Sequence, residues 1–205
     1  GSLGYVGTGE ATGVYYNDFW EYNPSTNVWT TKANFGGVVR SAACGFAIGS
    51  KAYIGTGVNG FTYYKDFWEY DPATNTWTQK ADLGGSRRKN AVGFSIRGKG
   101  YIGTGFLYDG SDHFYTDLWE YDPSTNIWTT KASFGGVGRE AAAGFSIGSK
   151  GYIGTGLGGT YPYKFYNDFW EYDAVANTWS KKADLGVAVR HTAVGFSIGP
   201  DGYIG

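Results

Sequence analysis

Hydrophobic and aromatic residues form short runs along the whole chain, and Gly, Asn, Asp and Pro separate these runs. Runs of four to eight residues, rich in β-branched and aromatic side chains, are typical of short strands joined by tight turns. No stretch has the helical spacing of apolar positions. Within one unit of the pattern, four strands are expected at 42–48, 53–56, 67–70 and 76–80. The pattern therefore predicts an all-β chain.

The unit repeats four times. Two series of tryptophans mark it, each with spacings of 48, 51 and 51 residues: Trp20, Trp68, Trp119 and Trp170, then Trp29, Trp77, Trp128 and Trp179. We predict one domain over 1–205, with repeats at about 1–48, 49–96, 97–147 and 148–198 and a partial repeat at 199–205. Four antiparallel strands at this period fit the blades of a β-propeller. We expect all eight tryptophans to be structural, filling the space between blades.

The first strand of each unit is rich in Ala and Gly, as expected for the innermost strand of a blade. The second strand ends in a glycine pair, as in Gly55-Thr56-Gly57, after a tyrosine and before the two spaced tryptophans. These marks resemble the kelch repeat, in the variant typical of bacterial secreted kelch proteins, over essentially the whole chain. The resemblance implies four-stranded propeller blades, ligand-facing loops on one side and an extracellular or cell-surface location.

The two ends of the chain share one sequence pattern. Residues 1–7 match 148–154 and also 199–205, so a second strand is present at both ends. Three arrangements are open. A ring closes by strand exchange, the chain is a stretch of a larger propeller with five to seven blades, or open blade edges lead to self-association.

Charge and composition exclude several classes of partner and site. Seventeen Lys and Arg against 18 Asp and Glu give a net charge of −1, with no basic run, so neither nucleic acid nor an anionic membrane is an expected partner. One Cys cannot form an internal disulfide, and two His cannot form a His-rich metal site. No apolar stretch reaches the ~20 residues of a membrane span. We expect no metal, no cofactor and no membrane insertion.

Residues present in every repeat are expected to serve the fold, and residues that vary are candidates for ligand contact. By this rule the recurring aspartates tie a turn to backbone donors, and the recurring glutamates are solvated or link blades; they are Asp18, Asp66, Asp117, Asp168, Glu21, Glu69, Glu120 and Glu171. Four recurring arginines leave two interpretations open. They either hydrogen-bond to carbonyl groups between blades or form a ring near the axis that holds an anion.

The candidate binding surface combines the arginines, the variable positions that follow them and the loops between the second and third strands, at 10–17, 58–65, 106–116 and 157–167. Length changes in repeat proteins gather on one face, often the binding face. The candidates are Arg40, Arg88, Arg139, Arg190, Lys89, Asn90, Glu140, His191, Tyr15, Phe61, Tyr63, Tyr108, Asp109, Asp112, His113, Tyr161 and Tyr163.

These observations favour a non-catalytic module that recognises a protein, with carbohydrate binding as the alternative, because aromatic side chains suit both protein hot spots and sugar rings. An enzyme is the third hypothesis. Kelch propellers include a copper radical oxidase, but Cys44, His113 and His191 do not match its site, and Cys44 is expected to be a small core residue. The oxygen-rich loop 109–112 lacks the spacing of an EF-hand.

Overall fold

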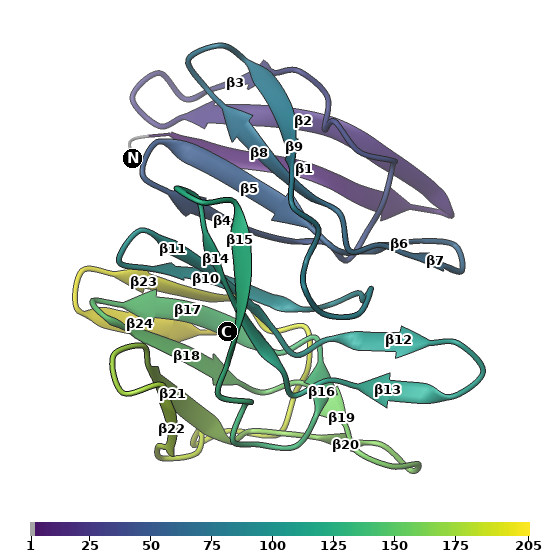
Figure 1. The fold of residues 1–205 in the computed structure, drawn as a ribbon, viewed down its shortest axis with the longest axis vertical. Helices are drawn as coiled ribbons and strands as arrows, with labels where there is room; N and C mark the ends of the chain where they lie inside the picture. Colours follow the sequence, from purple (N-terminus) through teal and green to yellow (C-terminus); the bar gives the residue numbers. More distant parts are fainter. Residues whose placement is uncertain (1–2) are drawn as a thin grey trace.

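The computed structural model describes residues 3–205 and contains only strands, turns and irregular segments in that range (Figure 1). Three antiparallel sheets of four strands form its centre. Each follows chain order from the innermost strand to the outermost strand. The strands are β4 (Cys44–Ile48), β5 (Lys51–Gly55), β8 (Phe67–Asp71) and β9 (Thr76–Lys80); β10 (Val92–Ile96), β11 (Lys99–Gly103), β14 (Leu118–Asp122) and β15 (Ile127–Lys131); and β17 (Ala143–Ile147), β18 (Lys150–Gly154), β21 (Phe169–Asp173) and β22 (Thr178–Lys181). We call these sheets the second, third and fourth modules.

Two smaller sheets flank the three modules. The first module comprises β1 (Gly4–Ala11), β2 (Val14–Asn23) and β3 (Val28–Thr31), and the terminal hairpin comprises β23 (Gly195–Ile198) and β24 (Asp201–Ile204). The all-β prediction and the four-stranded antiparallel unit are confirmed. The strand predicted at 76–80 has those bounds, whereas the one predicted at 42–48 begins two residues later, because Ala42 has a positive φ of 54°.

The segments expected as loops between the second and third strands also contain short strands. They are β6 (Val58–Asn59) and β7 (Thr62–Tyr63), β12 (Phe106–Tyr108) and β13 (Asp112–Phe114), and β19 (Leu157–Gly158) and β20 (Lys164–Phe165), with β16 (Arg139–Glu140) beside β19. In the first module the long strands β1 and β2 pair through this region. Figure 1 shows the short hairpins extending from the same side of the molecule.

The modules pack through their small innermost strands and large aromatic side chains. A Cβ added to Gly151 would lie 2.4 Å from the ring of Phe94 in the preceding module, so a glycine is required there. Val92, Phe94, Tyr101, Leu118 and Tyr172 belong to one buried cluster that joins the third and fourth modules. This explains why small residues alternate with aromatic residues in each unit.

The turns between the last two strands of each sheet also connect neighbouring modules. Asn75 adopts the left-handed conformation, with φ 53°, and its side-chain oxygen accepts the amide of Ala33 in the preceding module. Trp77 Nε1 donates to the carbonyl of the same Ala33. Trp77, Trp128 and Trp179 have this role, whereas Trp29 of the first module is 51% exposed. The structure describes no helix in residues 3–205 that could span a membrane.

Candidate functional site

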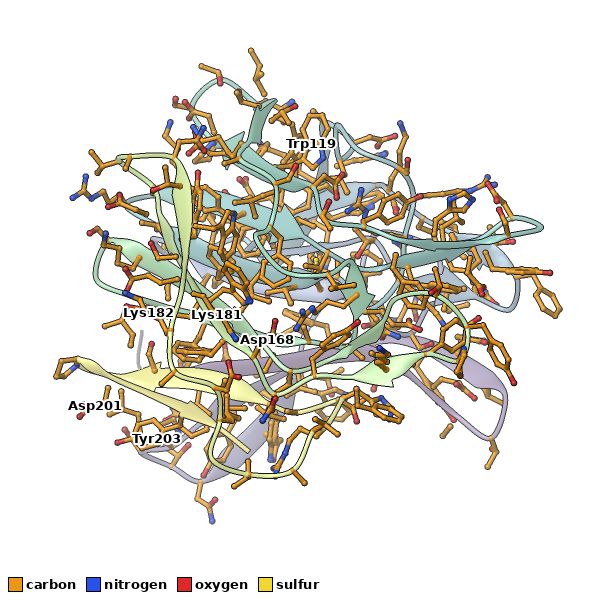
Figure 2. All side chains as sticks on the ribbon, turned by 90° about the horizontal axis from the view of Figure 1, so that it is seen from below. Trp119, Asp168, Lys181, Lys182, Asp201 and Tyr203 are labelled. Atoms are coloured by element: carbon orange, nitrogen blue, oxygen red, sulfur yellow. The ribbon has the colours of Figure 1, made fainter. Side chains whose placement is uncertain are left out.

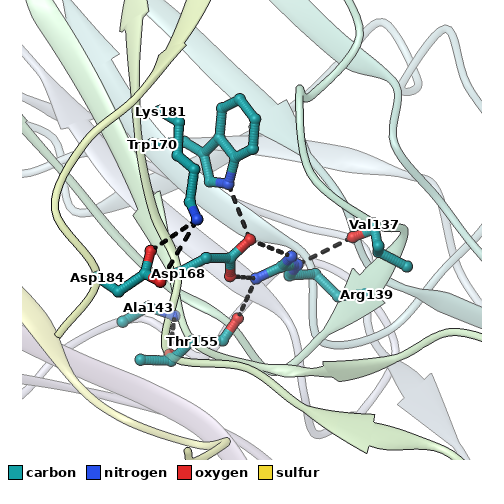
Figure 3. A network of polar contacts seen from close by, with 8 residues as sticks. All are labelled: Val137, Arg139, Ala143, Thr155, Asp168, Trp170, Lys181 and Asp184. Carbon is teal, nitrogen blue, oxygen red and sulfur yellow. Dashed lines mark hydrogen bonds and ion pairs between the residues drawn. The ribbon is translucent and has the colours of Figure 1, made fainter. Parts of the chain in front are cut away.

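The recurring arginines belong to buried clamps. Figure 3 shows one of them, in which Arg139 Nη2 lies 3.0 Å from Asp168 Oδ2 and Arg139 Nη1 donates to the carbonyl of Thr155. The Arg139 guanidinium stacks on Tyr166 at 4.2 Å from the ring centroid, and Trp170 Nε1 donates to the same carboxylate. Arg40 and Arg88 repeat these contacts with Asp66 and Asp117.

The electrostatics of the clamp favour the charged pair. Burial by itself would raise the pKa of Asp168, but hydrogen bonds from Arg139 and Trp170 outweigh it, and the pKa lies below its usual value. Three arginines are fully buried, namely Arg40, Arg88 and Arg139. Because these guanidinium groups already bind an aspartate, the interpretation as an anion-holding ring is wrong for these three residues. They do donate to carbonyl groups, as the other interpretation expects, but these carbonyl groups belong to the same module.

The role expected for the recurring aspartates is also corrected. Asp66, Asp117 and Asp168 bind arginine and tryptophan side chains rather than backbone donors of a turn. The recurring glutamates accept hydrogen bonds from tyrosines on the neighbouring strand. For example, Tyr53 Oη donates to Glu69 Oε2 at 2.6 Å. Both sets serve the scaffold.

Arg190 differs from the other three arginines. It is half-buried, its Nε donates to the carbonyl of Ala188, and no carboxylate in the described part of the chain pairs with it. At the other end of the molecule, Asp18 accepts from Trp20 Nε1 but has no arginine partner among residues 3–205.

The variable positions that follow the arginines lie next to one another. Asn90 Nδ2 donates to Glu140 Oε2 at 2.8 Å, and Lys89 Nζ lies 3.7 Å from the same oxygen. Backbone hydrogen bonds connect these positions from module to module, from Asn90 N to Ala42 O and from Ala141 N to Asn90 O. The structure thus brings Lys89, Asn90 and Glu140 together, as expected for a shared surface.

Aromatic and acidic side chains of neighbouring short hairpins contact one another. Tyr163 Oη donates to Asp112 of the neighbouring module, and its ring lies 5.5 Å from that of Phe114. Burial raises the pKa of Tyr63 most, and the charges of Glu140 and Asp112 raise it further against a backbone hydrogen bond that lowers it.

The remaining candidates lie on the hairpins. Tyr161 packs on Tyr163, and His191 stacks on Phe165 at 5.1 Å. His113 Nε2 lies 2.8 Å from Asp109 Oδ1, which places both at the exposed end of the β12–β13 hairpin. Tyr15 lies opposite Glu10 in the β1–β2 pair of the first module, so the structure does not bring it together with the other candidates within residues 3–205. The described residues contain no group of three or more His, Cys, Asp or Glu side chains that could hold a metal ion.

A groove of about 810 Å³ adjoins the hairpins between the second and third modules. We call it the charged groove, because Lys65, Asp82, Ser86 and Arg87 line it together with the candidates Tyr63 and Asp109. Asp82, Ser86 and Arg87 lie outside every segment predicted for the binding surface, whereas Lys65 ends the predicted loop 58–65. A signal for Ser86 and Arg87 is present in the sequence, because this polar pair replaces Val38-Val39, Val137-Gly138 and Ala188-Val189 of the other modules.

Comparisons with known proteins support the fold and leave the family open. No protein-family model matches the chain, and no curated protein matches it. A solved structure of a protein named YjhT is similar over 95% of this chain, with a TM-score of 0.81 and 20% sequence identity. The chain spans 66% of the length of that structure's chain. At this identity the similarity concerns the arrangement of the strands alone: the chain has the all-β architecture found in YjhT.

Proposed function

We propose that the chain is a kelch-type propeller, or a stretch of a larger one, and acts as a non-catalytic module that recognises a protein. Its modules are the blades and its short hairpins form the binding surface. The observation that carries the proposal is the exposure of aromatic side chains on these hairpins: Phe61 is 97%, Tyr161 84% and Tyr108 53% exposed. In keeping with the kelch resemblance, the proposal includes a secreted or cell-surface location.

The physical case rests on the contrast between a rigid scaffold and protruding aromatic groups. Isolated exposed aromatic side chains on hairpins provide large contact areas at a low entropy cost, and tyrosine is enriched at binding hot spots. The clamps at Arg88 and Arg139 fix the base of the hairpins, so binding requires little ordering of the backbone.

Selection of peptides from a displayed library tests the proposal. Selected peptides should bind the chain and lose at least ~10-fold in affinity when Phe61, Tyr108 and Tyr161 are all changed to Ala. Val175→Ser is the matched control, because Val175 is 70% exposed and lies in the turn between β21 and β22. Equal binding by the triple variant and the control would reject the hairpin surface.

The charged groove favours carbohydrate as a second candidate. Tyr63 and Trp119 offer aromatic surface, while Lys65, Asp82 and Arg87 offer hydrogen-bond donors and acceptors. A glycan array with the wild-type chain tests this candidate, and Arg87→Val serves as the groove variant, because Val39 occupies that position in the preceding module. Retention of a glycan that Arg87→Val abolishes would support it, whereas no retention by the wild-type chain would reject it.

A further inference from the structure

Three sets of contacts, one within modules and two between them, have unmatched halves at the two ends of the molecule. Within each complete module, the arginine before the innermost strand binds the aspartate before the third strand, and a tyrosine stacks on that arginine. These contacts recur three times with the same geometry. Arg190 occupies the arginine position before β23, whereas Asp18 and the 43% exposed Tyr16 occupy the other positions in the first module.

A second set of contacts is divided in the same way. Ala33, Ala81 and Ala132 exchange hydrogen bonds with an asparagine and a tryptophan of the following module. Ala183 is the equivalent residue before the terminal hairpin and is exposed. Asn27 and Trp29 are the equivalent partners in the first module, where Trp29 is 51% exposed.

A third set concerns the phenylalanine of each innermost strand. Phe46 stacks on Tyr53 at 5.8 Å and covers Gly93 and Gly100 of the following module. Phe145 covers Gly195 and Gly202 in the same way. Phe196 of β23 is the last of this series and remains 47% exposed.

The first module has a groove where its innermost strand would lie. The groove has a volume of about 460 Å³, and its walls include Tyr5 and Phe19 of the first module and Gly45 and Ala52 of the second. By the geometry of the internal modules, a phenylalanine in this position stacks on Tyr5 and Phe19 and covers Gly45 and Ala52. The groove is therefore shaped for a strand with the sequence pattern of β23.

The two unmatched halves lie apart in the molecule. β1 pairs only with β2, and β23 only with β24, among residues 3–205. Figure 1 shows the purple first module at the top and the yellow terminal hairpin in the lower half, with other modules between them. In Figure 2, Asp201 and Tyr203 lie on this hairpin at the margin of the molecule.

We propose that a second copy of this chain occupies the groove, with its β23 adding beside β1. The segment Gly4–Gly7 of β1 has the same pattern as Gly202–Gly205, so β1 can replace β24 as the partner of β23. Phe196, now opposite Tyr203, then lies opposite Tyr5. Arg190 of one copy forms the clamp with Asp18 and Tyr16 of the next.

This contact joins different surfaces of the two copies. Such a head-to-tail interface produces a ring when the rotation between copies closes and an open filament when it does not. Burial of Phe196 supplies apolar area, and the bidentate ion pair supplies orientation, because arginine and carboxylate meet in one planar geometry. The proposal is independent of what binds the hairpin surface.

Charge exchange tests the proposal with sedimentation velocity over a concentration series. The wild-type chain should associate reversibly. Arg190→Asp and Asp18→Arg should each weaken self-association by at least ~10-fold, because like charges then meet at the clamp. A 1:1 mixture of the two variants should restore association to within about threefold of wild type, since both contacts are again complementary. Lys164→Asp, on the exposed strand β20, is the control and should associate as wild type.

Three outcomes would overturn the proposal. They are a wild-type chain that stays monomeric at its highest soluble concentration, association that neither charge variant weakens, and a mixture that does not recover. Far-ultraviolet circular dichroism of each variant establishes that it is folded. Recovery in the mixture also excludes misfolding as the cause of the single-variant effects.

Discussion

Arg139 and Arg190 occupy the same position in successive modules, yet their surroundings differ. Arg139 is fully buried and bound to Asp168, Thr155 and Tyr166, whereas Arg190 is half-buried with one carbonyl contact. The sequence around both residues is similar, so the residue alone does not determine its role. The difference shows that each clamp depends on the third strand of the same sheet, which supplies the carboxylate.

Removal of each arginine in turn gives the largest expected effect. Arg139→Ala should lower the free energy of unfolding by about 3 kcal/mol, because it leaves the Asp168 carboxylate partly buried without its partner. Arg190→Ala should change it by less than ~0.5 kcal/mol. Urea unfolding followed by tryptophan fluorescence measures both, at a dilution where association does not contribute. Equal losses would show that the two sites are energetically the same.

A pair of glycine substitutions sharpens the comparison between internal and terminal modules. Gly151→Ala should cost ~1–3 kcal/mol, because its Cβ would lie 2.4 Å from Phe94 in a packed core. Gly4 is the equivalent residue in the first module. A Cβ added to Gly4 would lie 3.8 Å from its nearest neighbour, the Cβ of Tyr22. Gly4→Ala should therefore be within ~0.5 kcal/mol of wild type in the same urea experiment. A cost for Gly4→Ala as large as that for Gly151→Ala would contradict an open first module.

Acid should weaken the internal clamp. Because the folded-state pKa of Asp168 is lowered, the unfolded chain binds this proton more readily, and the stabilisation is present above the unfolded pKa of about 3.9. It is lost as the pH falls through the folded pKa. The difference in unfolding free energy between wild type and Asp168→Asn should therefore shrink below about pH 4.

Other carboxylates also titrate in acid, and their effects on the unfolding free energy cancel when wild type is compared with Asp168→Asn. Asp173 has a pKa of about 2, lowered most by its hydrogen bond from Lys150, and it is present in both proteins. Urea midpoints measured from neutral pH to about pH 2 give the comparison. A constant difference across this range would show that the charge of Asp168 does not stabilise the fold.

Repetition made the strands predictable and the side-chain partners harder to predict. The tryptophan period located every four-stranded sheet, and the composition of the innermost strand predicted small residues such as Gly144, where an added Cβ would lie 2.1 Å from Val92. The equally crowded Gly151 lies in the second strand and was not predicted. The arginine clamps were not predicted, because Arg40 and Asp66 are 26 residues apart while Arg88 and Asp117 are 29 apart. Such a pair becomes visible only when the strand register is known.

The candidate surface was predicted in part for a similar reason. Lys89, Asn90 and Glu140 were predicted because the two positions after the arginine vary between modules, and the structure brings these three residues together. Ser86 and Arg87 were not predicted, because they precede the arginine and face the groove only through the packing of the second module against the third. Contacts across modules, such as Tyr163 with Asp112, depend on hairpin geometry that local sequence does not determine.

The clamps also make the molecule suited to display of foreign sequences. The hairpin between Arg88 and Asp117 is three residues longer than that between Arg40 and Asp66, yet the Nη2–Oδ2 distances are 2.7 and 2.8 Å. The three extra residues therefore lengthen the hairpin without changing the geometry of the clamp. Doubling the length of a flexible loop costs only about 0.6 kcal/mol in closure entropy. Randomised segments grafted between β12 and β13 would vary the contact surface while the packed sheets keep their architecture.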